Sequence, residues 1–210
     1  MGRVLSVNVG KPKQIGVQRG RAQMSAIGKA PVTGRVRVEG VNLAGDDQAD
    51  RRVHGGPDKA VYAYAAEDIA WWAFQLERDD FPPGMFGENL TTEGVDVTNA
   101  VIGERWRIGT VELEVCQPRF PCYKLGLRFG DPLMVKMFAH AGKPGAYLRI
   151  VSAGELEAGD QVDITHRPSH GVTIAQVSRA VLLDDAQLEA AAAAPELPES
   201  LSRWMLERAA

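Results

Sequence analysis

The chain lacks several features that would assign it to a protein class at once. Only two of its 210 residues are cysteines, Cys116 and Cys122, which excludes a disulfide-stapled scaffold. A disulfide between these two stays open, although prolines stiffen the loop that would have to close. No apolar run approaches membrane-spanning length, and no secretory signal opens the chain. We therefore expect no membrane partner and a reducing, cytoplasmic environment.

Common catalytic and metal-binding signatures are missing as well. The four histidines are scattered, and neither they nor the cysteines have the spacing of zinc ligands. The sequence contains no P-loop, no dinucleotide-binding glycine motif and no nucleophile elbow. The formal net charge of -3 gives no general attraction to nucleic acid or acidic membranes, although local basic clusters occur. These absences argue against a zinc enzyme and against nucleic acid as a partner.

The residues that are present favour a β-rich globular protein. Hydrophobic residues make up 45% and charged residues 24%, which is ordinary for a chain that buries a core. Many short segments alternate apolar and polar residues between glycine-rich turns, and few show helical spacing. Residues 11–20 carry glycines and a proline, which predict turns and short extended pieces there. The pattern as a whole predicts a mainly β protein, a barrel with a few helices, over residues 1–165.

The sequence pattern changes after this barrel. Residues 166–171 are rich in His, Pro and Gly and are expected to form a linker. Thr173 is followed three residues later by Gln176, which predicts a capping box at a helix start. Asp184 can cap a second helix through the alanine run, and a third helix follows two prolines. Residues 172–210 are thus predicted to form a small all-α unit of three helices.

One thiol stands in an unusual setting, the segment 117–125, which reads Gln-Pro-Arg-Phe-Pro-Cys-Tyr-Lys-Leu. Its two prolines predict a stiff extended loop rather than a helix. Arg119 and Lys124 flank Cys122, and nearby positive charge favours the thiolate, the form that attacks substrates or binds metals. The alternative is that Cys122 is a buried structural cysteine. Side-chain chemistry alone supports the two interpretations about equally.

A second candidate segment contains two consecutive glycines among basic residues. Glycine amides can approach a ligand closely and form an anion-binding nest, and flanking cations would add charge-assisted hydrogen bonds to a phosphate. The alternative is a tight turn with solvated charges. The candidate residues are Arg51, Arg52, His54, Gly55, Gly56 and Lys59.

A third candidate segment reads Phe-Gly-Glu-Asn-Leu-Thr over residues 86–91. Glu88 could serve as a general acid or base, and Asn89 as an amide that orients a substrate. Considered alone, the segment favours the alternative of turn chemistry, in which Asn and Gly are common.

Five ordered segments together resemble the MOSC domain family (molybdenum cofactor sulfurase C-terminal domain). The similarity is greatest to its stand-alone bacterial YiiM-like branch, in which a three-helix appendage follows the barrel. The segments lie within residues 28–125 and read Gly28-Lys29-Ala30-Pro31-Val32, Gly45-Asp46-Asp47-Gln48-Ala49-Asp50, His54-Gly55-Gly56-Pro57-Asp58-Lys59-Ala60-Val61-Tyr62, Pro83-Gly84-Met85-Phe86-Gly87-Glu88-Asn89-Leu90-Thr91 and Gln117-Pro118-Arg119-Phe120-Pro121-Cys122-Tyr123-Lys124-Leu125.

The resemblance implies a β barrel that binds a molybdopterin-type molybdenum cofactor. Cys122 matches the cysteine that ligates molybdenum in cofactor-bearing relatives, and a thiolate is a suitably soft ligand. Residues 51–59 would cradle the pterin phosphate, with Glu88 and Asn89 near the metal or the substrate. Relatives reduce N-hydroxylated bases such as hydroxylaminopurines, with electrons from a separate redox partner. A detoxifying N–O reductase is therefore the leading hypothesis.

Two departures from the wider family limit this hypothesis. The chain has no ferredoxin-like cysteine cluster, so electrons must come from another protein, and it lacks the pyridoxal-phosphate domain of some relatives, so pyridoxal phosphate is not expected. A second hypothesis is a sulfur or cofactor carrier in which Cys122 bears a persulfide. A third is an interaction protein whose helical tail docks a partner. The oligomeric state stays open, with a homodimer as one option.

Overall fold

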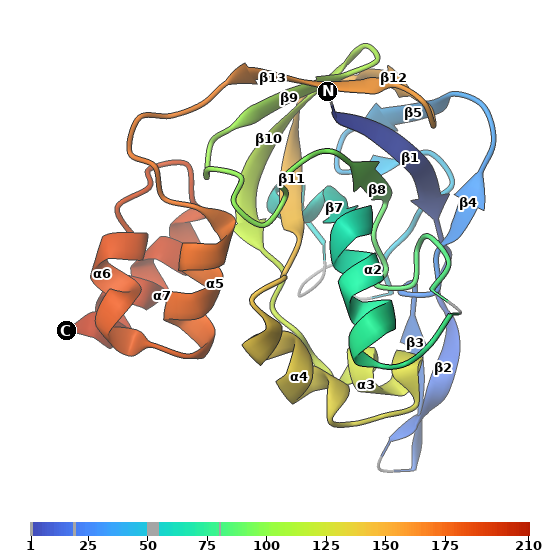
Figure 1. Ribbon diagram of the computed structural model, residues 1–210, viewed down its shortest axis with the longest axis horizontal. Helices are drawn as coiled ribbons and strands as arrows, with labels where there is room; N and C mark the ends of the chain where they lie inside the picture. The colour runs from blue at the N-terminus through green and yellow to red at the C-terminus, as the bar shows by residue number, and fades with distance from the viewer. Residues whose placement is uncertain (1, 19, 50–54, 80) are drawn as a thin grey trace.

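Short strands dominate the fold, as the alternating sequence pattern predicts. The computed structural model describes residues 2–18, 20–49, 55–79 and 81–210 (Figure 1). The strands are β1 (Gly2–Val9), β2 (Lys13–Gln18), β3 (Arg21–Ser25), β4 (Ala30–Val32), β5 (Val36–Glu39), β6 (Asn42–Leu43), β7 (Val61–Ala65), β8 (Leu90–Glu93), β9 (Arg105–Ile108), β10 (Val111–Pro118), β11 (Ala146–Ser152), β12 (Gly154–Leu156) and β13 (Gln161–His166).

The main sheet closes on itself. Its strand order is β13-β9-β10-β11-β7-β8-β1, and β13 also pairs with β1 through Gly2 opposite Val162. The pairing of β7 with β8 is parallel, and the other pairs of this ring are antiparallel. Closure leaves these strands without an open edge. The predicted β barrel is therefore confirmed. Strands β12, β5 and β6 form a separate small sheet, and β2 pairs with β3 as a hairpin that projects from the barrel (Figure 1).

Helices cover the barrel in two groups. Helix α2 packs on β7 and β8, and α3 lies beside α4, whereas α5 to α7 gather near the C-terminus (Figure 1). None of the helices in the described ranges combines the length and apolarity needed to cross a bilayer. The helices and 3-10 turns (η) are η1 (Pro57–Lys59), α2 (Ala66–Gln75), α3 (Tyr123–Phe129), α4 (Met134–Ala141), α5 (Ile174–Leu182), η2 (Asp185–Gln187), α6 (Leu188–Ala191) and α7 (Glu199–Ala209).

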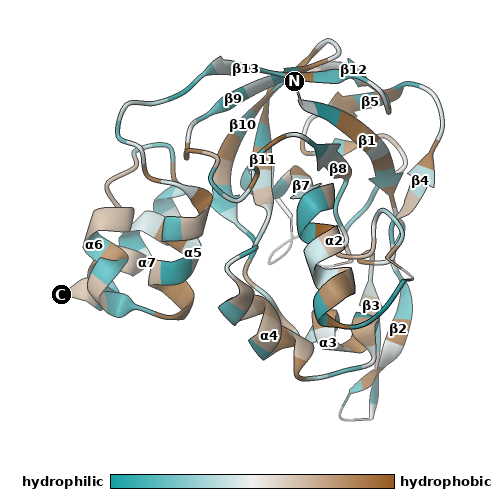
Figure 2. Cartoon of the chain, in the orientation of Figure 1, coloured by the Kyte–Doolittle hydropathy of each residue, from teal (hydrophilic) through white to brown (hydrophobic). Residues whose placement is uncertain are grey.

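One hydrophobic core fills the barrel and continues beneath the C-terminal helices. Trp106 and Leu113 of the barrel belong to the same buried cluster as Ile174 and Val177 of α5. Brown, hydrophobic stretches accordingly run along the barrel strands and along one side of α5 (Figure 2). The barrel and the C-terminal helices thus share one core. The division into a barrel (1–165), a linker (166–171) and a helical unit (172–210) stays a prediction.

A second, aromatic cluster lies beneath α2, α3 and α4. Trp72 stacks on Phe138 with 6.1 Å between ring centroids, and Phe86 packs against both rings. The indole nitrogen of Trp72 donates to the hydroxyl of Tyr64 at 2.9 Å, so this buried polar group is satisfied. Because Phe86 and Leu125 belong to it, this cluster supports the segment before β8 and the start of α3.

Two local predictions need correction. Within residues 11–20, expected as turns and short extended pieces, Lys13–Gln18 form strand β2, which pairs with β3 (Arg21–Ser25) as a hairpin. The segment 117–125 is extended only as far as Cys122, because α3 begins at Tyr123. Proline is tolerated just ahead of a helix, where no intrahelical amide is lost, so Pro121 marks the helix start and does not forbid it.

The capping box at the start of α5 gives a direct test of the helical unit. The Thr173 hydroxyl accepts from the Gln176 amide at 3.2 Å, and the Gln176 side chain accepts from the Thr173 amide at 2.8 Å. Thr173→Ala should lower the free energy of unfolding by about 1 kcal/mol. Chemical denaturation measures it, with Thr33→Ala in an exposed loop as control. Equal losses in the two variants would contradict this assignment.

Candidate functional site

A pocket opens where the base of the β2–β3 hairpin meets the end of the barrel and the start of α3. The space measures about 700 Å³ when the open solvent at its mouth is included. The segments that form its wall are far apart in sequence. They supply Ser25, Ala26, Ile27, Lys29, Asp46, Asp47, Gln48, Ala49, Lys59, Tyr62, Phe86, Gly87, Asn89, Arg119, Phe120, Cys122, Lys124 and Tyr147.

The structure gathers about half of the predicted site residues in this wall. Those present are Asn89, Lys59, Arg119, Cys122 and Lys124. Gly55, Gly56 and Glu88 are described but do not line the pocket, and Arg51, Arg52 and His54 lie outside the described residues.

The double glycine has the geometry of a tight turn. Gly56 has a positive φ of 96° and directly precedes η1. The Lys59 amide donates to the carbonyl oxygen of Gly56 at 3.1 Å, which closes the turn. This turn carries Lys59 to the pocket wall, where burial lowers the pKa of its ammonium and the nearby Asp58 carboxylate opposes that shift.

The two cysteines occupy opposite environments. Cys122 is partly exposed in the pocket wall, in extended conformation immediately before α3. Cys116 is fully buried in β10, where its sulfur lies within hydrogen-bonding distance of the carbonyl oxygens of Asp58 (3.0 Å) and Tyr147 (3.3 Å). Burial raises the pKa of the Cys116 thiol to about 12. Cys116 is therefore the buried structural cysteine. Cys122 is the thiol that a ligand can reach.

Arg119 places a fixed positive charge behind the pocket. Its side chain is buried, and its guanidinium donates to the carbonyl oxygen of Phe86 at 2.5 Å. The same guanidinium lies 5.3 Å from the Tyr62 ring centroid and 5.4 Å from that of Phe138. Among the described residues, no carboxylate forms an ion pair with it. A buried cation held by rings and a carbonyl, with the pocket in front, suits an anionic ligand.

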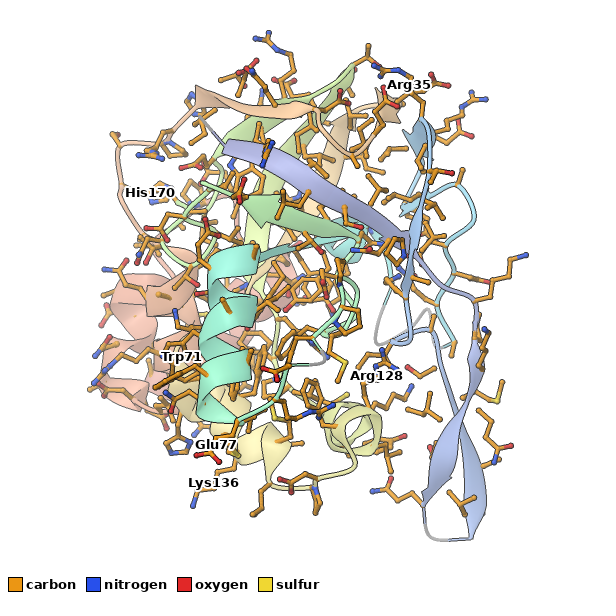
Figure 3. The ribbon with its side chains drawn as sticks, turned by 45° about the vertical axis from the view of Figure 1, so that its right-hand side comes forward. Arg35, Trp71, Glu77, Arg128, Lys136 and His170 are labelled. Carbon is orange, nitrogen blue, oxygen red and sulfur yellow. The ribbon has the colours of Figure 1, made fainter. Side chains whose placement is uncertain are left out.

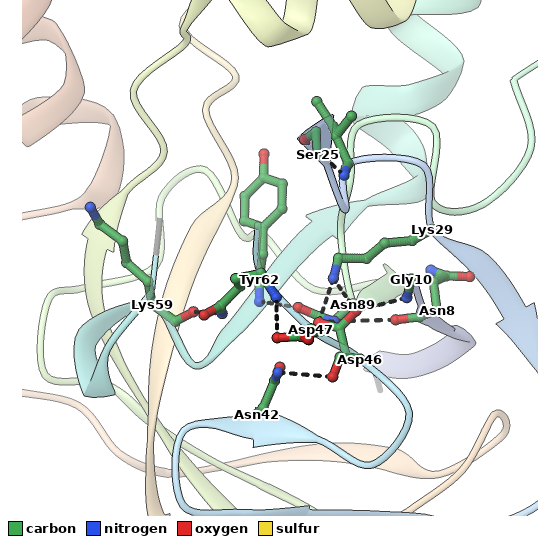
Figure 4. A network of polar contacts seen from close by, with 12 residues as sticks. Asn8, Gly10, Ser25, Lys29, Asn42, Asp46, Asp47, Lys59, Tyr62 and Asn89 are labelled. Atoms are coloured by element: carbon green, nitrogen blue, oxygen red, sulfur yellow. Dashed lines mark hydrogen bonds and ion pairs between the residues drawn. The ribbon is translucent and has the colours of Figure 1, made fainter. Parts of the chain in front are cut away.

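A buried ion pair between Lys29 and Asp46 forms another part of the wall (Figure 4). The Lys29 ammonium contacts both carboxylate oxygens of Asp46, which also accept from the Gly10 amide (2.7 Å) and from the Asn89 side chain (2.9 Å). Burial lowers the pKa of Lys29, and the Asp46 carboxylate opposes this shift. The pair and its hydrogen-bond donors therefore join the segment before β4, the loop after β6, the end of β1 and the segment before β8.

Asn89 has the contacts of a structural residue rather than those of a substrate-orienting amide. Its side-chain oxygen accepts from the Tyr62 amide at 3.1 Å. Its side-chain nitrogen donates to the carbonyl oxygen of Asn8 at 3.2 Å as well as to Asp46. Both hydrogens of the side-chain nitrogen are used in these bonds, so Asn89 has no free N–H group with which to orient a substrate. Asn89 instead fixes the pocket floor.

Glu88 is directed into its own loop. Its carboxylate accepts from the Gly84 and Phe86 amides, at 2.6 and 3.0 Å, and from the Thr91 hydroxyl at 3.0 Å. Burial raises the pKa of Glu88, and these donors oppose the shift. The loop packs closely on the segment before β4, since a Cβ at Gly84 would lie 2.6 Å from the Lys29 carbonyl oxygen. Glu88 is fully buried and does not line the pocket, so its contacts are those of a loop anchor, and the acid–base role stays a prediction.

Comparison with known proteins identifies the family of this chain. A family model described as MOSC domain matches residues 50–163. The chain belongs to the MOSC domain family. Protein YiiM of Escherichia coli is 34% identical over 189 residues, which cover 88% of this chain and 84% of that protein. The uncharacterized protein YflK of Bacillus subtilis is 36% identical over 176 residues, 84% of this chain and 79% of its own length. A protein named Reductase from Gibberella moniliformis is 31% identical over 94% of this chain, which spans only 35% of it.

Solved structures of MOSC relatives share the whole fold. The crystal structure of YiiM from Geobacillus stearothermophilus superposes with a TM-score of 0.81 at 29% identity, and each chain is covered completely. YiiM from Escherichia coli gives a TM-score of 0.78 at 27% identity, covering 100% of this chain and 92% of that one. The expected similarity to the YiiM-like branch is confirmed, C-terminal helices included.

The donor set of this MOSC pocket fits a ligand that is both anionic and thiophilic. Arg119, Lys59 and Lys124 supply positive charge to the wall, and Cys122 supplies one reachable sulfur. Among the described residues, no cluster of three or more His, Cys, Asp or Glu could hold a bare metal ion. A metal bound here would need most of its ligands from a cofactor, and such a cofactor could use the cations for a phosphate.

Selective alkylation tests the assignment of the two thiols. Iodoacetamide at mildly alkaline pH should modify Cys122 and spare Cys116, because Cys116 is buried and its raised pKa keeps it protonated. Peptide mass mapping counts the adducts, with Cys122→Ser as the folded control and the denatured protein as the fully reactive reference. Modification of Cys116 in the folded protein at the rate of Cys122 would refute the assignment.

Proposed function

We propose that this MOSC protein binds a molybdopterin-type molybdenum cofactor in the pocket and reduces N-hydroxylated compounds, hydroxylaminopurines among them, in the cytoplasm. The observation that carries the proposal is the meeting of one reachable thiol with a fixed cationic wall. Cys122 would ligate molybdenum, and Arg119, Lys59 and Lys124 would hold the phosphate. Membership of the MOSC family and the reductase-named relative support the same class of chemistry.

The wall residues would divide the work of holding the ligand. Arg119 cannot turn away, because a carbonyl and two aromatic rings fix its guanidinium, so its charge points at one place. Lys59 and Lys124 approach from separate segments, which would favour a phosphate between them over a lone halide. When bound, the cofactor supplies the two-electron chemistry that protein side chains lack.

The proposed reaction cleaves one N–O bond. A hydroxylamine R–NH–OH takes up two electrons and two protons, the N–O bond breaks, an N–H bond forms, and the oxygen leaves as water. A proton must reach the departing hydroxyl so that it leaves as water. The electrons come from a separate protein, since the two cysteines of the chain are single thiols rather than ligands of a cluster.

A second function is favoured by the position of Cys122 at the pocket edge. A thiol that lies partly exposed in extended backbone can accept sulfane sulfur and hand it on, so a sulfur or cofactor carrier is the alternative. A carrier would bind cofactor or accept sulfur without reducing any N-hydroxylated compound.

Metal analysis and turnover together test the proposal. We expect molybdenum and pterin to copurify with protein made in a cofactor-producing host, and reduced viologen to drive hydroxylaminopurine reduction. Cys122→Ala should lower that turnover at least about a hundredfold, since losing even an outer-shell partner of a metal typically costs ten- to a hundredfold. Elemental analysis and product chromatography are the measurements.

Cys116→Ala is the matched control, because it removes the chain's other thiol, which does not itself line the pocket. It should keep both molybdenum and turnover. Wild-type protein without molybdenum would contradict the proposal, and cofactor binding without turnover would select the carrier.

A further inference from the structure

The basic residues of this chain are unevenly distributed. Residues 1–38 contain eight lysines and arginines and no aspartate or glutamate, although the whole chain carries a net charge of -3. The remainder of the chain is therefore strongly acidic. Such an asymmetry creates a local field that the overall charge conceals.

Many of these early cations are neutralised where they lie, and the exceptions gather on the hairpin. Lys11, Lys13 and Arg21 are exposed on or beside β2 and β3, and none of them forms an ion pair with a described carboxylate. The neutralised ones pair as Arg3 with Glu93, Lys29 with Asp46, Arg35 with Glu157 and Arg37 with Glu39.

Helix α3 extends the same positive face. It packs against β2, and the Tyr123 hydroxyl donates to the Gln23 side chain of β3 at 2.6 Å. Lys124 and Arg128 of this helix are also without an ion pair among the described residues. Figure 3 shows Arg128 beside α3, and its Nε donates to the carbonyl oxygen of Met85 at 3.5 Å. We call the surface formed by Lys11, Lys13, Arg21, Lys124 and Arg128 the basic face.

Apolar side chains lie within the basic face. Val17 is 61% exposed, Met24 47% and Tyr123 40%, although each is large enough to cost free energy in water. Methionine, tyrosine and arginine are enriched at protein interfaces, where apolar centres have polar rims. This mixture favours a protein partner with acidic side chains around an apolar patch.

The basic face also adjoins the mouth of the pocket. β3 ends at Ser25, and the next two residues, Ala26 and Ile27, line the pocket wall together with Ser25. Tyr123 directly follows Cys122 in the chain. A protein seated on the hairpin and α3 would therefore lie beside the thiol.

We propose that the basic face docks an acidic redox protein that delivers electrons to the pocket. The inference rests on the proposed reductase function, which requires an outside donor. A one-electron donor would dock twice per turnover, and two electrons with two protons then convert one N–O bond into an amine and water. Electrostatic attraction accelerates encounters of this kind, and small, weak interfaces suit repeated docking.

Charge reversal tests the docking surface. The double variant Lys13→Glu/Arg21→Glu alters the basic face outside the pocket wall, and Arg107→Glu/Arg203→Glu makes the same change in charge on β9 and α7. The probe is an acidic flavodoxin in its hydroquinone form. Stopped-flow measurements at low and high salt give the association rate with each protein.

The hairpin variant should slow association at least about tenfold at low salt, and the control variant should leave it within about twofold. High salt should slow the wild type and remove the difference. Turnover with reduced viologen, which needs no docking, should be equal in all three proteins. If viologen turnover is absent but flavodoxin still binds through the hairpin, the reductase function fails while the docking surface stands. The proposal is overturned if flavodoxin does not bind, if its binding is insensitive to salt, or if both variants impair binding equally. Binding of an oligonucleotide in place of flavodoxin also overturns it.

Discussion

The pocket depends on one buried ion pair. Lys29 and Asp46 come from segments that share no strand, and both are almost fully enclosed. Burying two charges costs several kcal/mol, and the cost is offset only where geometry and extra hydrogen bonds are good. Asp46 meets that condition through the Gly10 amide and the Asn89 side chain. The pair, with the Gly10 amide, therefore fixes the segment before β4, the loop after β6 and the end of β1 in one arrangement.

Neighbouring contacts connect this ion pair to the Arg119 guanidinium in the pocket wall. Asn89 also binds the Tyr62 amide, and the Tyr62 ring lies beside the Arg119 guanidinium. Arg119 in turn is held by Phe86, whose amide donates to Glu88. A fixed positive charge thus lines the pocket, while Cys122 lies in its wall directly before α3. Rigid charge and an accessible sulfur are what an anionic, thiophilic ligand requires.

Much of the fold followed from the sequence, because barrel strands with one buried face carry a period of two. The capping residues Thr173 and Gln176 likewise marked a helix start through local hydrogen bonds. The β2–β3 hairpin was missed because both of its faces are largely exposed, so no burial pattern marks it. Cys122 was found from its prolines and cations. The pairing of Lys29 with Asp46 was not, since no local rule joins residues 17 positions apart through tertiary folding.

The roles of Glu88 and Asn89 were also beyond sequence reasoning, because a carboxylate beside an amide fits catalysis and loop anchoring equally. A double-mutant cycle on Lys29→Met and Asp46→Asn tests the central claim most directly. Each single variant leaves a buried charge without its partner, so we predict a coupling of about 2 kcal/mol or more in the free energy of unfolding. Additive effects, with coupling below about 0.5 kcal/mol, would contradict the claim that this ion pair assembles the pocket.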